Sequence, residues 1–293
     1  MRALDEMGLV HLLDMRYHVI SLVAVFLALG IGILLGTTIV ERGLIAEQKA
    51  QIRSLRATFD EIKKKNNQLD SELSAYKRFA DESRAYLLPG RLAGKPFAVV
   101  AGKGFDDKAL SGIHESVVAS GGNVPATITI SGSEAYENQA VIDNLETLFN
   151  MQGDKDTLRD RVYAEVVNQL KTASNTGILT TLEQLGLVQV RGVISAPVSG
   201  AVLLGGIEDD ALDRSDVPLV KAFVSAAFPL VGVGGGKTPD FVLEAYKKNG
   251  ISTIDHVDTA PGQVAMAMVL QGTGGNFGSG KTAGRMLPEP SGL

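Results

Sequence analysis

The sequence has no cysteine and no tryptophan among its 293 residues. Without cysteine the chain has no disulfide framework, no thiolate metal site and no cysteine nucleophile. This composition is compatible with an oxidising compartment, although it does not require one. Without tryptophan the protein lacks a residue that commonly anchors a span at the membrane interface, and Tyr17 and His18 are the nearest substitutes.

Excess charge and metal-ligating residues are also scarce. The net charge is −5, which argues against nucleic acid as a partner. The four histidines are scattered, and no His-rich or Met-rich tract of the kind that suits copper is present. Met266 and Met268 are two residues apart, so on a helix they point in nearly opposite directions. Because no Ser-His-Asp arrangement can be read from the spacing, we predict a protein without catalytic residues that is not an enzyme, and its metal ligands stay unknown.

What the chain does have is a long uncharged run over residues 19–40, between Arg16 and Glu41. As a helix this run is about 33 Å long, enough to cross a bilayer core of ~30 Å. We therefore predict a transmembrane helix over 19–40, preceded by a short leader over 1–18. No A-x-A-like cleavage site follows the run, which favours an uncleaved anchor.

Small residues recur every four positions within the span, at Ala24, Ala28, Gly32 and Gly36. They share one helix face, and Gly32 with Gly36 forms a GxxxG pair that lets two helices approach closely in lipid. Since glycine and alanine are common in spans, this face is either a dimer contact or ordinary span composition.

The orientation of the span is not fixed by charge. Arg42, Lys49, Arg53 and Arg56 outnumber Arg2 and Arg16, which by a simple count leaves the C-terminal side in the cytoplasm. That rule applies to short loops, and a long C-terminal region translocates regardless. Composition therefore leaves the topology open.

Residues 45–87 follow a heptad repeat, which predicts a parallel coiled-coil stalk over 41–88. The a positions are Ile45, Ile52, Phe59, Asn66, Leu73, Ala80 and Leu87, and the d positions are Gln48, Leu55, Ile62, Leu69, Tyr76 and Ser83. We expect a homodimer whose interface is formed by Gly32, Gly36, Ile52, Leu55, Phe59, Ile62, Asn66, Leu69, Leu73 and Tyr76.

Asn66 stands alone among apolar a residues. In a parallel dimer a buried asparagine hydrogen-bonds its symmetry mate and fixes the register. Lys65 then faces Asp70 of the second chain, and Glu72 faces Lys77, so both pairs attract. The alternative is one amphipathic helix packed on its own domain, although such a helix usually shows a wider apolar face.

Leu88-Pro89-Gly90 ends this helix. Over 95–271 strand-like and helical segments then alternate, which predicts an α/β head with a mostly parallel sheet and helices on both faces. We expect strands at 97–101, 124–130, 188–190, 201–204, 230–233 and 252–257, and helices at 108–120, 135–149, 156–172, 180–185, 217–228, 241–248 and 263–271. The Gly- and Pro-rich tail, 272–293, is expected to be irregular.

A glycine-rich stretch lies at the end of one expected strand and contains Gly232, Gly234, Gly235 and Gly236. Ligands of open α/β sheets bind at the carboxyl ends of strands. The sixth position of the GxGxxG pattern is Lys237, so the dinucleotide fingerprint fails. The stretch is either a loop that binds phosphate or another anion, or a tight strand-to-helix turn.

His256 and Asp258 lie at the end of the next expected strand. Alternation places them on one face and Asp255 with Val257 on the other. A histidine and an aspartate at this edge can bind a metal or move a proton. A surface histidine, with Asp258 or Thr259 capping the next helix, explains the same residues.

The tail matches the pattern GxxxxGK[ST] from Gly275 to Thr282. A phosphate-binding loop of this type needs a strand before it and a helix after it. Here a helix precedes it, and Pro288 and Pro290 soon follow. We therefore interpret the match as a chance product of a Gly-rich tail.

Three stretches together resemble a known family. They are Asp14-Met15-Arg16-Tyr17-His18-Val19-Ile20-Ser21-Leu22 before the span, the stalk, and Asp258-Thr259-Ala260-Pro261-Gly262-Gln263 near the end. They are similar to the MctB-type copper transporter family, which includes SteB-like envelope proteins. The resemblance runs from about Asp14 to Pro288, and residues 1–13 look like an extension.

The resemblance implies a single-pass protein of the cell membrane with an extracytoplasmic C-terminal domain. It implies either a scaffold in envelope assembly and cell separation, with a second membrane protein of the SteA kind, or copper transport and homeostasis. No copper ligand is carried over, because no position matches a defined copper motif, and no cofactor is expected beyond that copper. From the residues we favour the scaffold, with copper transport as the alternative and a nucleotide- or anion-binding head as the third hypothesis.

Overall fold

The computed structural model describes residues 3–174, 177–206 and 212–289, without the side chains of 3–14, 37–46, 213 and 214. The leader, the span and the stalk all belong to one helix, α1 (Ala3–Leu87). Its candidate membrane span is Met15–Gly36, with a mean hydropathy of 2.8. This candidate overlaps the predicted span over residues 19–36, and the predicted bounds stay a prediction. Residues 37–40 of the prediction lie outside the described side chains.

Within α1, the side chains predicted to form the stalk interface are exposed. Exposed fractions are 49% for Ile52, 69% for Leu55 and Phe59, and 51% for Leu73. Gly32 and Gly36 have open space where a Cβ would lie. These are the properties expected of a surface that a second helix covers, but the coiled coil and the dimer stay predictions.

The head contains a seven-stranded sheet in the order β3-β2-β1-β4-β5-β6-β7. Neighbouring strands are parallel except β2 and β3, which are antiparallel. The strands are β1 (Phe97–Ala101), β2 (Ala126–Ile130), β3 (Val188–Gly192), β4 (Gly200–Leu204), β5 (Leu230–Val233), β6 (Ser252–Ile254) and β7 (Asn276–Phe277). The expectation of a mostly parallel sheet is confirmed.

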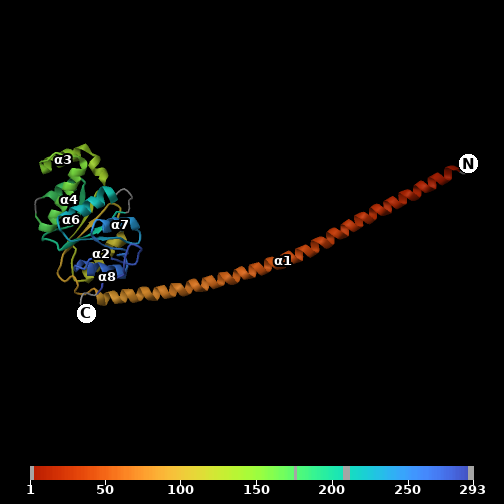
Figure 1. Ribbon diagram of the computed structural model, residues 1–293, viewed down its shortest axis with the longest axis horizontal. Helices are drawn as coiled ribbons and strands as arrows, with labels where there is room; N and C mark the ends of the chain where they lie inside the picture. The colour runs from red at the N-terminus through yellow and green to blue at the C-terminus, as the bar shows by residue number, and fades with distance from the viewer. Residues whose placement is uncertain (1–2, 175–176, 207–211, 290–293) are drawn as a thin grey trace. The chain divides into compact units, whose positions relative to one another are not determined.

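Alternate residues of the strands are buried in two separate hydrophobic cores. Ala98 and Val100 of β1 face one core, and Val99 and Ala101 face the other. Helices α2 (Asp107–Ala119) and α8 (Ala260–Leu270) cover one face. The other face carries α3 (Gln139–Phe149), α4 (Lys155–Thr172), α5 (Ile178–Gln184), α6 (Val217–Ser225) and α7 (Asp240–Lys248). Figure 1 shows α2 and α8 on one side of the sheet and α4 and α6 on the other.

Three local predictions differ from the structure. The expected helix 135–149 is divided into a 3-10 turn, η1 (Ser133–Glu137), and α3, because the Asn138 side chain accepts from the Ala140 N–H and starts a new helix. Strand β6 ends at Ile254 rather than at residue 257, and His256 has a positive φ of 48°. The tail, expected to be irregular, supplies β7, which pairs with β6 through Ile254 and Phe277.

Candidate functional site

The glycine-rich turn after β5 uses its backbone donors inside the protein. The Gly234 N–H donates to the Ile254 carbonyl at 2.9 Å, Gly235 donates to Thr238 Oγ1 at 3.0 Å, and Gly236 donates to Asp258 Oδ1 at 3.2 Å. Gly232 lies earlier, inside β5, where a Cβ would be 2.5 Å from the Tyr246 ring. Gly232 is thus a packing residue, while the other three form a closed turn.

The structure brings the predicted residues after β6 next to this turn. A Cβ on Gly236 would lie 3.6 Å from Asp258 Oδ2 and 3.9 Å from the His256 ring. The His256 side chain is 40% exposed, and its Nδ1 lies 3.5 Å from Asp255 Oδ1. Thr259, one of the two proposed caps, accepts the Gly262 N–H at the start of α8. Five of the six predicted ligand-binding residues therefore share one edge of the sheet, and their role stays a prediction.

Asp255 organises the segment that matched the phosphate-loop pattern. The Gly280 N–H donates to both Asp255 carboxylate oxygens at 2.9 Å, and the Thr282 hydroxyl donates to Oδ2 at 3.3 Å. Asp255 is 5% exposed. An internal carboxylate therefore takes the amide and hydroxyl donors that a nucleotide phosphate would need. Sequence spacing did not reveal this role, because the two segments are far apart along the chain.

A second buried carboxylate lies near the carboxyl ends of the paired strands β1 and β4. The helices that follow these strands, α2 and α6, cover opposite faces of the sheet, which makes this the usual ligand crevice of such folds. Asp216 is 1% exposed and accepts a 2.5 Å hydrogen bond from the Tyr246 hydroxyl. Burial raises the pKa of Asp216 to about 6, against the opposing effects of the Tyr246 hydroxyl and the Gly206 N–H. A Cβ on Gly102 would lie 3.0 Å from Asp216 Oδ1, and one on Gly205 would lie 3.2 Å from Oδ2. The protein's own side chains thus fill this crevice.

Buried hydroxyl groups of Tyr163 and Ser215 lie near Asp216, and that of Tyr136 lies near Tyr163. Among the described residues, the hydroxyls of Tyr136, Tyr163 and Ser215 are buried without a hydrogen-bond partner. Burial raises the pKa of Tyr163, and the nearby Ser215 hydroxyl partly offsets that rise, although the geometry between them is too poor for a hydrogen bond. Sequence analysis missed this cluster, because nothing local marks a tyrosine as buried and unpaired.

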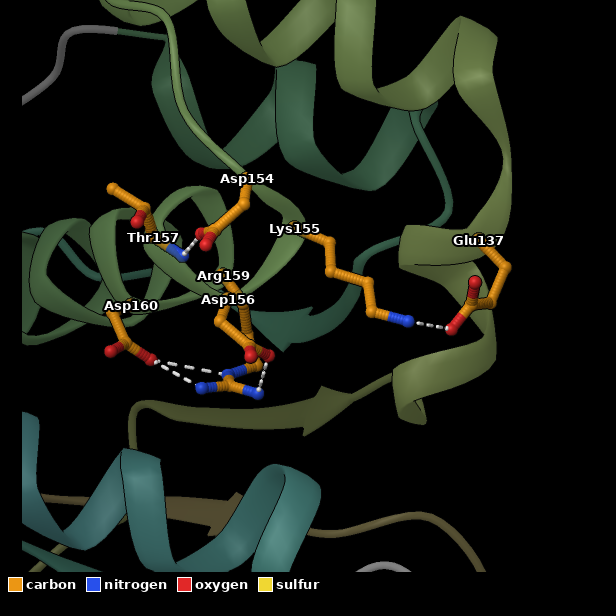
Figure 2. Close-up of polar contacts among 7 residues, drawn as sticks. All are labelled: Glu137, Asp154, Lys155, Asp156, Thr157, Arg159 and Asp160. Atoms are coloured by element: carbon orange, nitrogen blue, oxygen red, sulfur yellow. Dashed lines mark hydrogen bonds and ion pairs between the residues drawn. The ribbon is translucent and has the colours of Figure 1, made fainter.

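A polar pocket of about 330 Å³ opens beside the first turn of α4. Figure 2 shows Lys155 reaching Glu137 across it, at 2.5 Å, and Arg159 held between Asp156 at 2.7 Å and Asp160 at 2.8 Å. Asp154 begins the helix by accepting the Thr157 N–H at 2.8 Å. Lys155 is paired with one carboxylate and Arg159 with two, so both cations of this pocket are already engaged by the protein's own acidic groups.

Copper would be a substrate here, and the described residues offer few ligands for it. No group of three or more His, Cys, Asp or Glu side chains is placed to hold a metal ion in the described part of the chain. The chain also has no cysteine, the soft ligand that Cu(I) favours.

Comparison with known proteins agrees with the sequence resemblance. The chain matches the family described as "Copper transport outer membrane protein, MctB" over residues 12–288. Proteins named copper transporter MctB from Mycobacterium bovis and from two strains of Mycobacterium tuberculosis are 23% identical to it over 308 residues. These matches cover 93% of this chain and 98% of each relative. Since the family match extends over nearly the whole sequence, the chain belongs to the MctB family of copper transport proteins.

Proposed function

We propose that this protein is a homodimeric membrane anchor that contributes to copper transport in the cell envelope through a partner protein. In this proposal α1 crosses the membrane and pairs with a second copy, and the head lies on the extracytoplasmic side. The head then acts as a scaffold that binds its partner, and we expect that partner to be a second membrane protein of the SteA kind.

The observation that carries this proposal is the apolar stripe of the stalk. Ile62 is 53% exposed, Leu69 52% and Leu73 51%, on a stretch rich in charged residues. Apolar side chains at heptad spacing are stable in water when a second helix covers them. The charge pattern of Lys65 with Asp70 and of Glu72 with Lys77 fits a parallel second copy.

The scarcity of metal ligands supports an indirect role in copper transport. The relatives are named copper transporters, but the described part of this chain has no group of three or more His, Cys, Asp or Glu side chains placed to hold a metal ion. Direct copper transport by this chain is the alternative, and the family description favours it.

A nucleotide- or anion-binding head is the third candidate. Its proposed residues are Gly234, Gly235 and Gly236 with His256 and Asp258. An anion at this turn would have to displace the Asp258 carboxylate from the Gly236 N–H, and it would meet that negative charge directly. We therefore place this function behind the first two.

Complementation of a deletion strain tests the first proposal. We expect wild-type protein to return the copper accumulation and the copper sensitivity of the deletion strain to the levels of the parent strain. We also expect it to co-purify with a differently tagged second copy. The double variant Leu69→Glu/Leu73→Glu places like charges in the seam, so we expect it to lose both properties. Asn67→Glu/Ser71→Glu is the matched control, because it adds the same charge at exposed positions outside the seam.

Different outcomes test the copper role and the homodimer separately. If deletion leaves copper accumulation and sensitivity unchanged, the copper role is wrong. If wild type fails to co-purify with the second copy, the homodimer is wrong, and if the seam variant still co-purifies, the stalk seam is not the contact between the copies. Identification of the proteins that co-purify with wild type, but not with the seam variant, then names the partner.

A further inference from the structure

The last turns of α1 belong to the compact unit of the head, which begins at Ala75. Ala80 and Ser83 are half-buried there, and Leu88 is 1% exposed. Arg84 lies on the same side and donates to Gln263 of α8 and, at 3.3 Å, to Glu115 of α2. The a position Ala80 and the d position Ser83 are therefore less accessible to a second copy than the seam positions before them, which are exposed.

A different side of these turns carries exposed aromatic residues. Tyr76 is 72% exposed, Phe79 71% and Tyr86 87%. Phe79 and Tyr86 are seven residues apart and occupy g positions of the heptad, which flank the seam. Aromatic side chains of this size carry a large apolar area, so their exposure in water is unfavourable.

These aromatic residues continue the stripe of the stalk after one irregular step. Along Asn66, Leu69, Leu73 and Tyr76 the spacing alternates between three and four residues. From Tyr76 a second step of three reaches Phe79, and the alternation then resumes through Ser83 to Tyr86. A repeated three-residue step of this kind is a stammer, which locally overwinds a coiled coil.

We infer that the surface facing the second copy shifts at Tyr76, from the a and d positions to the side formed by Tyr76, Phe79 and Tyr86. This inference rests on the homodimer proposed above. The physical cause is competition for one face of the helix, because Ala80 is half-buried beside the head and Arg84 is bonded to it. Tyr76 belongs to both stripes, so the contact with the second copy is continuous.

Lipid is not the occupant of this surface. The candidate span ends at Gly36, and the charged stalk separates it from Phe79. A second copy carries the same aromatic side in the same register when the two chains are parallel. The shift therefore lets two helices stay in contact beside two heads without breaking the Arg84 contacts.

The absence of cysteine makes cross-linking a direct test. Single-cysteine variants of the full chain in membranes are treated with a short bis-maleimide. We expect Phe79→Cys to cross-link as efficiently as the seam control Leu73→Cys. Ala80→Cys, which is half-buried beside the head, and Arg78→Cys, which is exposed at the outward-facing f position, should cross-link several-fold less. Glu72→Cys gives the background for a g position outside the shifted segment.

The alternatives give different patterns. An unbroken heptad predicts that Ala80→Cys cross-links strongly and that Phe79→Cys stays at the level of Glu72→Cys, a result that would overturn the shift but keep the homodimer. Failure of Leu73→Cys itself would overturn the homodimer and the shift with it. Thermal unfolding of each variant, compared with wild type, identifies any substitution that disturbs the head.

Discussion

At the scale of single residues, two buried carboxylates of the head accept hydrogen bonds from the protein's own donors. Asp216 and Asp255 both lie near the carboxyl ends of the sheet's strands, where related architectures bind ligands. Asp216 accepts from Tyr246, and Asp255 accepts from the Gly280 N–H and the Thr282 hydroxyl. Internal carboxylates thus occupy positions that a phosphate or substrate would use, which agrees with a head that binds a protein partner.

The first residue-scale prediction concerns pH. Burial raises the pKa of Asp216 from its usual 3.8 to about 6, so the folded protein holds this proton more tightly than the unfolded chain does. The stabilisation is complete below the unfolded pKa and is lost as the pH rises through about 6. In Asp216→Asn we therefore expect this loss to vanish, so that its stability relative to wild type rises by up to about 3 kcal/mol between about pH 4 and pH 7.

Urea unfolding of the full chain in detergent, followed by tyrosine fluorescence, measures this difference. The pH trend is the informative quantity, because the substitution also changes the hydrogen bonds with Tyr246 and Gly206 by a fixed amount. Asp240→Asn, at an exposed position on α7, is the matched control. Parallel stability curves for wild type and Asp216→Asn across this pH range would contradict the assignment.

At the scale of elements, the C-terminal tail is an integral part of the sheet. β7 contributes only Asn276 and Phe277, and the following segment is attached through Asp255. Gly278 has φ 135° and leaves no room for a side chain, since a Cβ there would lie 1.8 Å from Asp255 Oδ1. A short strand with so few ladder hydrogen bonds depends on this carboxylate for its position.

We therefore expect Asp255→Ala to loosen the tail. Hydrogen bonds to a charged group contribute about 1.5–3 kcal/mol each, so local opening should increase roughly 10-fold or more. Limited trypsin digestion of the full chain, with cleavage at the exposed Lys281 and Arg285, reports this opening. Asp258→Ala is the control, because it removes the bond to Gly236 and keeps those to Gly280 and Thr282. Equal cleavage rates in both variants would show that Asp255 does not hold the tail.

At the scale of the whole molecule, the side of the membrane that carries the head decides which partners it meets. We expect an extracytoplasmic head. In the cysteine-free chain, Lys248→Cys places one thiol at an exposed position at the end of α7. A membrane-impermeant maleimide should label it in intact cells, while a cytoplasmic marker protein stays unlabelled. Labelling that requires opened cells would place the head in the cytoplasm and exclude an envelope partner outside the membrane.

Much of this architecture is encoded by neighbouring residues. The uncharged run determined an apolar helix near the N-terminus, and the β-α alternation determined a mostly parallel sheet. Strands β1 and β5 begin and end where their apolar runs do. Thr259 caps α8 because its side chain reaches the Gly262 N–H within the same turn. Such features follow from periodicity and local hydrogen bonds, so the sequence by itself determines them.

Only the tertiary structure decided which distant groups meet. The pairing of Asp216 with Tyr246, and that of Asp255 with Gly280, depends on strand order and on the packing of helices across the sheet. The half-burial of Ala80, with Phe79 left exposed, likewise depends on how the head packs on the end of α1. A heptad pattern marks both positions as near the seam, but it carries no information about which face a folded domain already occupies. The reason is that periodicity records the spacing of residues along the chain, whereas burial and pairing are set by contacts between segments far apart in it.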